Sequence, residues 1–201
     1  METKSISTRT AVKNIQLPKQ LKETMDFTAW HVAVAAEAIA AGQFARIGFD
    51  VSVQYGADQP EYDLIISRKD KLLKVSVKGS NTGWWGLTQG YKKNVNYHQA
   101  VDLWLADHTT KTILCFVQFK NIQVNEMPRI YLATPTEIAQ RLKETAKGRG
   151  YTILYEDHTY VMKKAAGYGT TDKIPDAWKF SKERVAHLIG TTSNGKSIKL
   201  K

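Results

Sequence analysis

The sequence predicts a mixed α/β domain whose sheet is partly antiparallel, and three observations predict it. Apolar residues recur at helical spacing across residues 27–47. Three short apolar or alternating stretches follow at residues 49–53, 62–66 and 72–78, which is the pattern of closely connected strands. Further along, Thr134 and Pro135 supply a capping hydroxyl and a first-turn proline for another helix. This order of elements favours a sheet flanked by helices.

The first helix presents an apolar stripe that contains one carboxylate. We expect five residues of the stripe to face the sheet, with Gly48 ending the helix: Trp30, Ala33, Val34, Ala40 and Phe44. Glu37 lies seven residues after Trp30 and seven before Phe44, in the middle of this stripe. An unpaired ionised carboxylate in such a place costs several kcal/mol. Glu37 should therefore be hydrogen-bonded, paired with a cation or bound to a metal.

The second and third strands form a predicted hairpin around the charged tetrapeptide at residues 68–71. With the turn there, antiparallel register sets Asp63 opposite Ser76 and Glu61 opposite Lys78. Alternation places these four side chains on one face of the hairpin. The other face carries an apolar layer for packing, made of Tyr62, Leu64, Ile66, Leu73, Val75 and Val77. The hairpin thus predicts a core on one side and a polar site on the other.

The rest of the chain alternates between weaker helices and strands. A loop rich in glycine and tryptophan is expected at residues 79–90, then a helix near 95–102 and strands at 113–119 and 129–133. The helix that Thr134 caps covers residues 137–147. A short strand at 151–154 and a last helix at 181–189 complete the pattern. The sequence contains no internal repeat.

Length and composition indicate one globular domain. With 201 residues, 42% of them hydrophobic and 24% charged, the chain can bury one core. We expect a single domain at residues 26–190, between flexible basic segments at 1–25 and 191–201. The single cysteine, Cys115, sits in an apolar strand and is expected to be a small buried hydrophobe. This excludes an internal disulfide framework and a zinc site built on cysteines.

The charge balance points to nucleic acid as the first partner to consider. Lys and Arg number 29 against 19 Asp and Glu, a formal net charge of +10, which attracts phosphate polymers. No apolar run approaches the length of a membrane span and the N-terminus lacks the apolar region of a secretory signal. We therefore expect a cytoplasmic protein with no membrane partner. An assembly protein whose charge is incidental is the alternative from another class.

The candidate residues resemble the motifs of the PD-(D/E)XK nuclease superfamily, which has the restriction-endonuclease-like fold. The pattern is an acidic residue on a helix, an Asp on a hairpin and then an acid-x-Lys triplet. Here it is matched by Glu37 in Ala35-Ala36-Glu37, by Asp63 in Tyr62-Asp63-Leu64-Ile65, and by Lys78 in Val75-Ser76-Val77-Lys78-Gly79-Ser80. The resemblance covers residues 28–120. In this chain Ser76 replaces the acid of the triplet.

The resemblance implies a metal-dependent endonuclease that hydrolyses phosphodiester bonds, with Glu37, Asp63 and Lys78 as catalytic residues. Mg²⁺, or Mn²⁺ in its place, would be held by Asp63 and Glu37, with Ser76 as a third, weaker ligand. Lys78 would orient or help to deprotonate the attacking water and offset charge on the phosphate. Glu61, opposite Lys78, is expected to substitute for the missing acid. DNA is favoured over RNA as the substrate, and a homodimer is left open.

Four residues beside this site are predicted to contact nucleic acid: Trp84, Trp85, Lys92 and Lys93. Trp84 and Trp85 lie between glycines directly after the Lys78 strand, so they could be platforms for a base or buried anchors for the loop. Lys92 and Lys93 could contact backbone phosphates or form an ordinary solvated face.

The same residues could instead have purely structural roles. Asp63 could be only a strand-start residue, and Lys78 only an edge lysine that blocks strand pairing. Ser76 could be a plain polar strand residue. The alternative function of the same fold is a catalytically inactive nucleic-acid-binding module, which the loss of the acid at Ser76 would explain.

Overall fold

The computed structural model describes residues 27–54, 62–108 and 111–193. The expected N-terminal flexible segment, most of the C-terminal one, and Glu61 lie outside the described residues. Helix α5 (Lys182–Ser193) continues past residue 190, so the predicted boundary of the C-terminal segment falls inside this helix. Over the described ranges, no helix is both long enough and apolar enough to cross a membrane.

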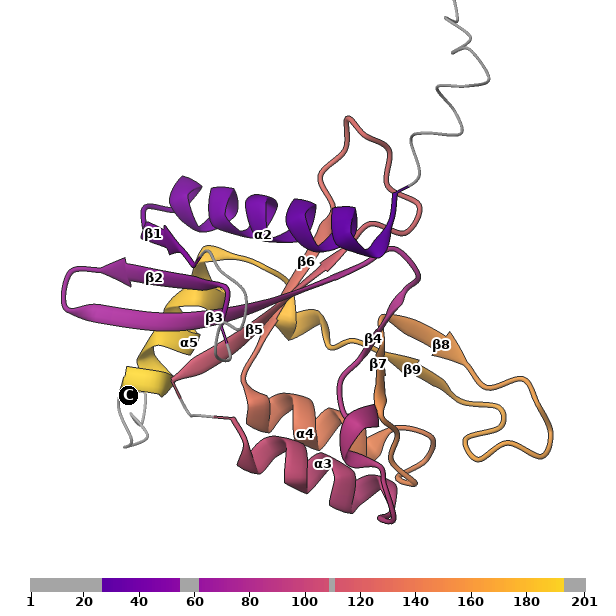
Figure 1. Ribbon diagram of the computed structural model, residues 1–201. Helices are drawn as coiled ribbons and strands as arrows, with labels where there is room; N and C mark the ends of the chain where they lie inside the picture. The colour runs from indigo at the N-terminus through magenta and orange to yellow at the C-terminus, as the bar shows by residue number, and fades with distance from the viewer. Residues whose placement is uncertain (1–26, 55–61, 109–110, 194–201) are drawn as a thin grey trace, which may run out of the picture.

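Five strands form a mixed sheet in the order β1-β2-β3-β5-β6 (Figure 1). Its antiparallel half consists of β1 (Asp50–Val53), β2 (Leu64–Arg68) and β3 (Lys71–Ser80). Strand β5 (Thr112–Gln118) runs parallel to β3, and β6 (Arg129–Ala133) runs antiparallel to β5. This arrangement confirms the predicted mixed α/β class and the antiparallel hairpin.

The register of the β2–β3 hairpin is the predicted one. Ser67 pairs with Leu72 and Leu64 with Val75, on either side of the charged turn. At the other end the ladder departs from this register, because the Asp63 amide donates to the Val75 carbonyl at 2.9 Å. Asp63 therefore lies in a bend just before β2, and not in the strand itself.

Helices cover both faces of the sheet. Helix α2 (Ala29–Arg46) and α5 pack on one face, where their apolar residues join those of all the central strands in one buried cluster. Helices α3 (Tyr97–Ala106) and α4 (Pro135–Glu144) pack on the other face around Leu114 and Phe116. Figure 1 shows α2 above the strands and α3 with α4 below them. Cys115 is fully buried in the first cluster, as predicted.

The face that helix α2 presents to the sheet agrees with the predicted stripe at Ala40 and Phe44 and differs from it in the first half of the helix. Its buried residues are Val32, Ala36, Ala40 and Phe44, which recur every four positions. Trp30 is 69% exposed and Val34 is also exposed, so neither belongs to the core. Apolar residues occur on several sides of this helix, so spacing alone selected the wrong positions in its first half. Glu37 follows the buried Ala36 and is half-buried at the margin of the packed face.

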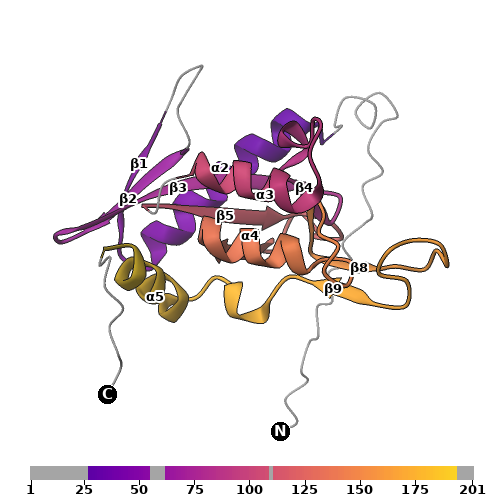
Figure 2. The same ribbon diagram turned by 90° about the horizontal axis from the view of Figure 1, so that it is seen from below.

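Several short elements were not predicted. Strand β4 (Trp84–Gly86) lies within the expected loop and pairs with β7 (Ile153–Tyr155). A second ribbon joins β8 (Asp157–Thr159) to β9 (Thr171–Lys173), and Figure 2 shows it projecting from the body of the molecule. Two 3₁₀ turns occur at Gln89–Tyr91 and Asp176–Trp178. Strand β7 overlaps the short strand predicted at 151–154. Strands β4, β8 and β9 were missed, because strands of three residues are too short to display an alternation.

Candidate active site

The candidate site lies where β3 extends beyond its neighbour β2. Strand β2 pairs with Lys71–Val75 of β3, whereas β5 pairs with residues 74–80 on the opposite side. The last residues of β3 therefore have an edge that β2 does not cover. A pocket of about 470 Å³ opens at this edge, between β3, the start of α2 and the β4 segment. Its lining includes Glu37, Asp63, Lys78 and Trp84.

Asp63 closes part of the open edge with its own side chain. The Val77 amide donates to Oδ2 of Asp63 at 2.5 Å, in the place where a neighbouring strand would otherwise supply an acceptor. This hydrogen bond fixes the carboxylate on the edge of β3, next to Lys78. Asp63 also lines the pocket. The bend before β2 thus turns a strand-start residue into a positioned carboxylate.

Glu37 reaches the same pocket because α2 packs very closely on β3. A Cβ atom on Gly79 would lie 2.7 Å from the Val32 carbonyl oxygen and 2.9 Å from the Ala36 Cβ atom, both on α2. Only a residue without a side chain allows this approach. Glu37 follows Ala36 directly, so the contact at Gly79 brings its carboxylate to the open edge.

The pKa of Glu37 responds to both of the charged groups that share its pocket. Partial burial and then the neighbouring Asp63 carboxylate raise the pKa of Glu37 above its ordinary value, whereas Lys78 acts in the opposite direction. Two carboxylates and one ammonium group therefore share the pocket. Lys78 is exposed. Within the described ranges, its ammonium group is in none of the ion pairs formed.

Ser76 is not part of this pocket. It is 5% exposed and lies beside Leu114 of β5, among the residues covered by the other helical layer. The described lining of the pocket does not include it. Ser76 and Lys78 lie on the same face of β3, as the alternation of the strand predicts. The side chain of Ser76 is buried there, whereas that of Lys78 is exposed. A role for Ser76 as a metal ligand has no support in this placement.

The two tryptophans have opposite environments. Trp84 is 42% exposed and lines the pocket, whereas Trp85 is 3% exposed. The Trp85 indole donates from Nε1 to the Lys78 carbonyl at 2.8 Å, and its ring packs on Phe116 with centroids 5.1 Å apart. Trp85 is therefore a core residue that fixes the end of β3, and its ring is covered by protein. The expectation of a second stacking platform at Trp85 is corrected by this burial.

The two lysines predicted to contact phosphate also differ. The Lys92 ammonium group donates to the Val95 carbonyl at 2.5 Å and lies 4.8 Å from the centre of the Tyr97 ring. Lys92 is half-buried and helps to hold the turn before α3. Lys93 is exposed. Neither residue lines the pocket, so both lie outside the group formed by Glu37, Asp63 and Lys78.

The carboxylates fit one kind of metal better than another. Within the described ranges, no three His, Cys, Asp or Glu side chains gather into a metal-binding group. This donor set does not fit a zinc site, which uses three or four protein ligands. Mg²⁺ is commonly held by one or two carboxylates together with water and substrate phosphates. Glu37 and Asp63 fit that requirement, and Mn²⁺ accepts the same oxygen ligands.

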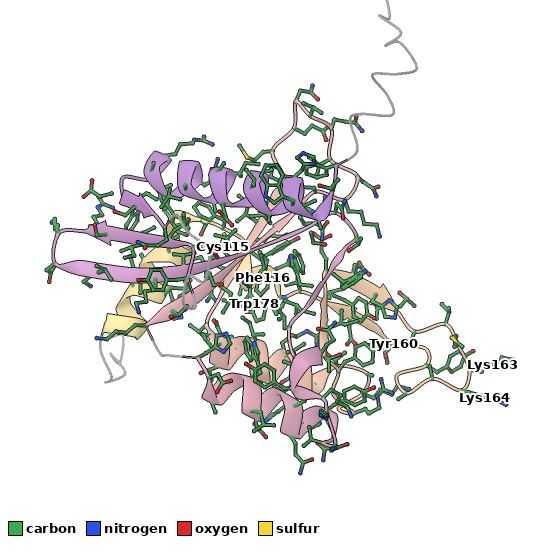
Figure 3. The ribbon with its side chains drawn as sticks, in the orientation of Figure 1. Cys115, Phe116, Tyr160, Lys163, Lys164 and Trp178 are labelled. Atoms are coloured by element: carbon green, nitrogen blue, oxygen red, sulfur yellow. The ribbon has the colours of Figure 1, made fainter. Side chains whose placement is uncertain are left out.

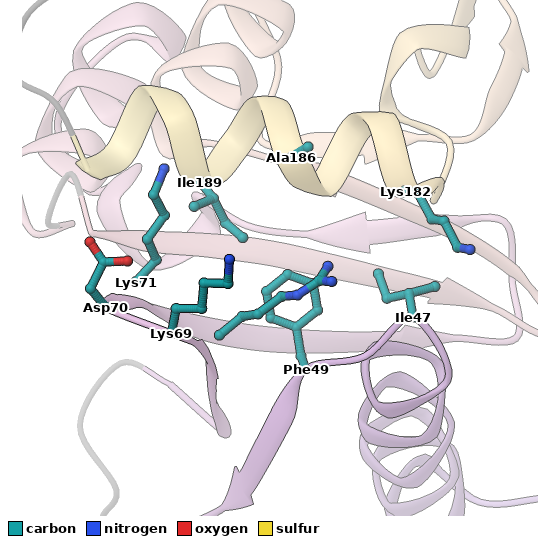
Figure 4. Close-up of a pocket in the computed structure, with 9 residues that line it drawn as sticks. Ile47, Phe49, Lys69, Asp70, Lys71, Lys182, Ala186 and Ile189 are labelled. Atoms are coloured by element: carbon teal, nitrogen blue, oxygen red, sulfur yellow. The ribbon is translucent and has the colours of Figure 1, made fainter.

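A second pocket, of about 490 Å³, lies between the β2–β3 turn and α5 (Figure 4). Its apolar floor includes Phe49 and Ile189, and its lining carries four cationic side chains: Arg68, Lys69, Lys71 and Lys182. Asp70 is the carboxylate in this lining. One carboxylate among four cations suits an anion and not a metal ion. This second pocket shares no lining residue with the pocket around Lys78.

Sequence reasoning missed Gly79, whose lack of a side chain positions α2. A glycine immediately after the strand lysine, facing a helix rich in alanine, was the available signal. It also missed the Val77 amide as the partner of Asp63, because a bend in the backbone leaves no trace in the pattern of apolar residues.

Comparison with protein-family models finds no match, and comparison with curated proteins finds none either. Among solved structures, the chain is similar to a bacterial homing endonuclease, I-Ssp6803I, with a TM-score of 0.42 and 13% sequence identity. The alignment covers 85% of this chain and 99% of the endonuclease chain. Because this similarity is low, we base the functional assignment on the geometry of the pocket.

Proposed function

We propose that the protein is a metal-dependent endonuclease that hydrolyses phosphodiester bonds in DNA. The observation that carries the proposal is the convergence of Glu37, Asp63 and Lys78 on one pocket, from three separate elements of the chain. The net charge of +10 supports a polyanionic substrate. The family resemblance of these three residues gives the reaction class.

The roles of the side chains follow from their charges and positions. Asp63 and Glu37 would hold Mg²⁺ or Mn²⁺, which when bound would supply Lewis-acid stabilisation of the phosphate and a more acidic water. Lys78 is exposed in the pocket and would offset the charge that develops on the phosphate oxygens, besides orienting the attacking water. The hydrogen bond from Val77 would keep Asp63 in place during the reaction.

Substitutions that preserve the fold test this assignment. Asn at position 63 retains an oxygen that can accept from Val77, whereas Ala would leave that amide without its acceptor and cost about 1–3 kcal/mol. We therefore expect Asp63→Asn and Lys78→Met to lower the rate of DNA cleavage by about 10²-fold or more at unchanged melting temperature. The measurement is nicking of plasmid DNA with Mg²⁺ or Mn²⁺, with the same assay on single-stranded DNA and on RNA.

Lys111→Met is the matched control, because it removes the same charge from an exposed lysine outside the pocket. It should leave the cleavage rate nearly unchanged. Cleavage by Asp63→Asn at the wild-type rate would overturn the assignment. Tight DNA binding by the wild-type protein with no cleavage under any of these conditions would identify an inactive binding module instead.

A further inference from the structure

A row of aromatic side chains crosses the surface formed by α3, β7 and β8. Along the row, the centroids of Tyr97 and Tyr151 are 5.4 Å apart, those of Tyr151 and Tyr155 are 6.0 Å apart, and those of Tyr155 and His158 are 4.1 Å apart. The last two pairs are stacked, with interplanar angles of 22° and 16°. All four residues are half-buried, so each keeps part of its surface open to solvent.

Cations lie over the row. The exposed Arg149 guanidinium is 4.9 Å from the centre of the Tyr97 ring and 5.2 Å from that of Tyr151. Lys92 lies 4.8 Å from the centre of the same Tyr97 ring. Positive charge is therefore held beside the aromatic rings at the α3 end of the row, an arrangement that cation–π attraction stabilises.

The row leads to the candidate active site through one cross-strand pair. Trp84 of β4 is directly opposite Tyr155 of β7, and directly opposed residues of an antiparallel pair share a face. The next pair, Trp85 and Leu154, is buried on the other face of the ribbon. Trp84 and Tyr155 therefore lie on the outer face together, and Trp84 also lines the pocket that contains Asp63 and Lys78.

The ribbon that carries Tyr155 is firmly anchored. The carboxylate of the adjacent Glu156 accepts hydrogen bonds from Arg129 at 2.6 and 2.8 Å and from the Tyr131 hydroxyl at 2.7 Å. The Glu156 amide donates to the Gly83 carbonyl at 2.9 Å. These bonds tie β7 to β6 and to the start of β4, so the rings on either side are preorganised.

We propose that the aromatic row, defined as Tyr97, Tyr151, Tyr155 and His158 with Arg149, binds an unpaired strand of DNA and guides it to the pocket. Proteins that bind single strands combine aromatic platforms for bases with cations that follow the phosphates, which is the pattern found here. A duplex keeps its bases stacked on one another and offers such rings no free base. The row thus makes single-stranded or locally opened DNA the preferred substrate class of the proposed endonuclease. Only the cleavage step of this inference rests on the proposed function; the binding of a single strand does not.

The test measures binding separately from cleavage. A fluorescein-labelled 20-nucleotide oligothymidylate and a duplex of mixed sequence and equal length are titrated with protein in EDTA, and anisotropy gives Kd. We expect Tyr155→Leu and Tyr151→Leu to raise Kd for the single strand by about 5- to 150-fold for each lost stack, with a much smaller change for the duplex. Arg149→Gln should weaken binding of the single strand and reduce the dependence of Kd on salt.

Matched controls come from the second pocket. Phe49→Leu removes a half-buried ring that also lies under a cation, since the Arg68 guanidinium is 5.8 Å from its centre, and Lys182→Gln removes one charge there. Neither should change the preference for the single strand. Thermal unfolding of every variant shows whether a loss of binding comes from a loss of folding.

The two proposals fail in different ways. Two outcomes would overturn the proposed role of the aromatic row. One is an equal loss of single-strand and duplex binding in Tyr155→Leu and Phe49→Leu, and the other is no loss in Tyr155→Leu at an unchanged melting temperature. Either outcome would leave Asp63 and Lys78 as catalytic residues. Selective loss of single-strand binding in a protein that never cleaves DNA would support the row and overturn the endonuclease. Equally tight binding of an RNA strand of the same length would overturn the restriction to DNA.

Discussion

Glu37 is a carboxylate placed where its charge is unfavourable in the free protein. Its partial burial and the Asp63 carboxylate raise its pKa, so the folded state disfavours the ionised form relative to the unfolded chain. For an acid with a raised folded-state pKa, stability is highest below the ordinary value, here 4.5, and falls as pH rises through the folded-state pKa. At neutral pH the wild-type protein therefore carries a destabilising charge.

We accordingly expect Glu37→Gln to raise the melting temperature at pH 7 while it lowers the cleavage rate. The difference in melting temperature between variant and wild type should shrink as pH falls below 4.5, where Glu37 is protonated in both states. Thermal unfolding in EDTA between pH 4 and 7 measures it. A variant that is less stable than the wild type at pH 7 would contradict the unfavourable environment assigned to Glu37.

At the scale of elements, the junction between α2 and β3 sets the geometry of the site. We expect Gly79→Ala to destabilise the protein by about 1–3 kcal/mol, because the added Cβ would lie within 3 Å of Val32 and Ala36 and would push α2 outwards. The displacement would also move Glu37 away from Lys78. Cleavage should therefore fall more than stability explains, as measured by urea unfolding and by the cleavage rate at a temperature where the variant is fully folded.

Gly90→Ala is a suitable comparison, because an added Cβ there would meet no atom within 4 Å. It should leave both stability and cleavage close to those of the wild type. If Gly79→Ala lost stability but kept the wild-type cleavage rate, the close packing of α2 would be structural and would not position Glu37.

The β2–β3 hairpin and helix α2 differ in how well their structure could be predicted from the sequence. The β2–β3 register could be predicted because alternation on both strands and the charged turn agree on one pairing. The face of α2 could not, because alanines surround Glu37 on most sides of the helix and only the contact with Gly79 selects Ala36 as the buried position. The aromatic row escaped prediction because its members lie on α3, on β7 and the segment just before it, and on β8, which only the tertiary fold brings together.

The whole molecule presents more positive charge than the candidate site needs. Lys163 and Lys164 are exposed between β8 and β9, and Figure 3 shows them at the tip of the projecting ribbon, far from Cys115 and Phe116 in the centre of the fold. Together with Arg149 and the basic second pocket, they extend the positive surface well beyond the pocket around Lys78. Such a distribution favours backbone contacts along a nucleic acid over readout of particular bases.

We expect the affinity for DNA to fall linearly in a plot of log K against log salt concentration. The double substitution Lys163→Gln with Lys164→Gln should reduce the slope by about 1–2 and weaken single-strand and duplex binding alike, because phosphate contacts are independent of base pairing. Anisotropy titrations at several salt concentrations measure the slope. An unchanged slope would show that the projecting ribbon stays clear of the nucleic acid.

The hydrogen bond between Val77 and Asp63 has a consequence for how the molecule exchanges protons with water. Amides held between strands exchange only when the sheet opens. The Val77 amide is held instead by a side chain, at 2.5 Å from Oδ2 of Asp63. Its exchange is therefore governed by the rotation of one carboxylate away from the amide, and no strand has to separate. Deuterium uptake at the Val77 amide therefore measures how often Asp63 leaves its hydrogen bond on the edge of β3.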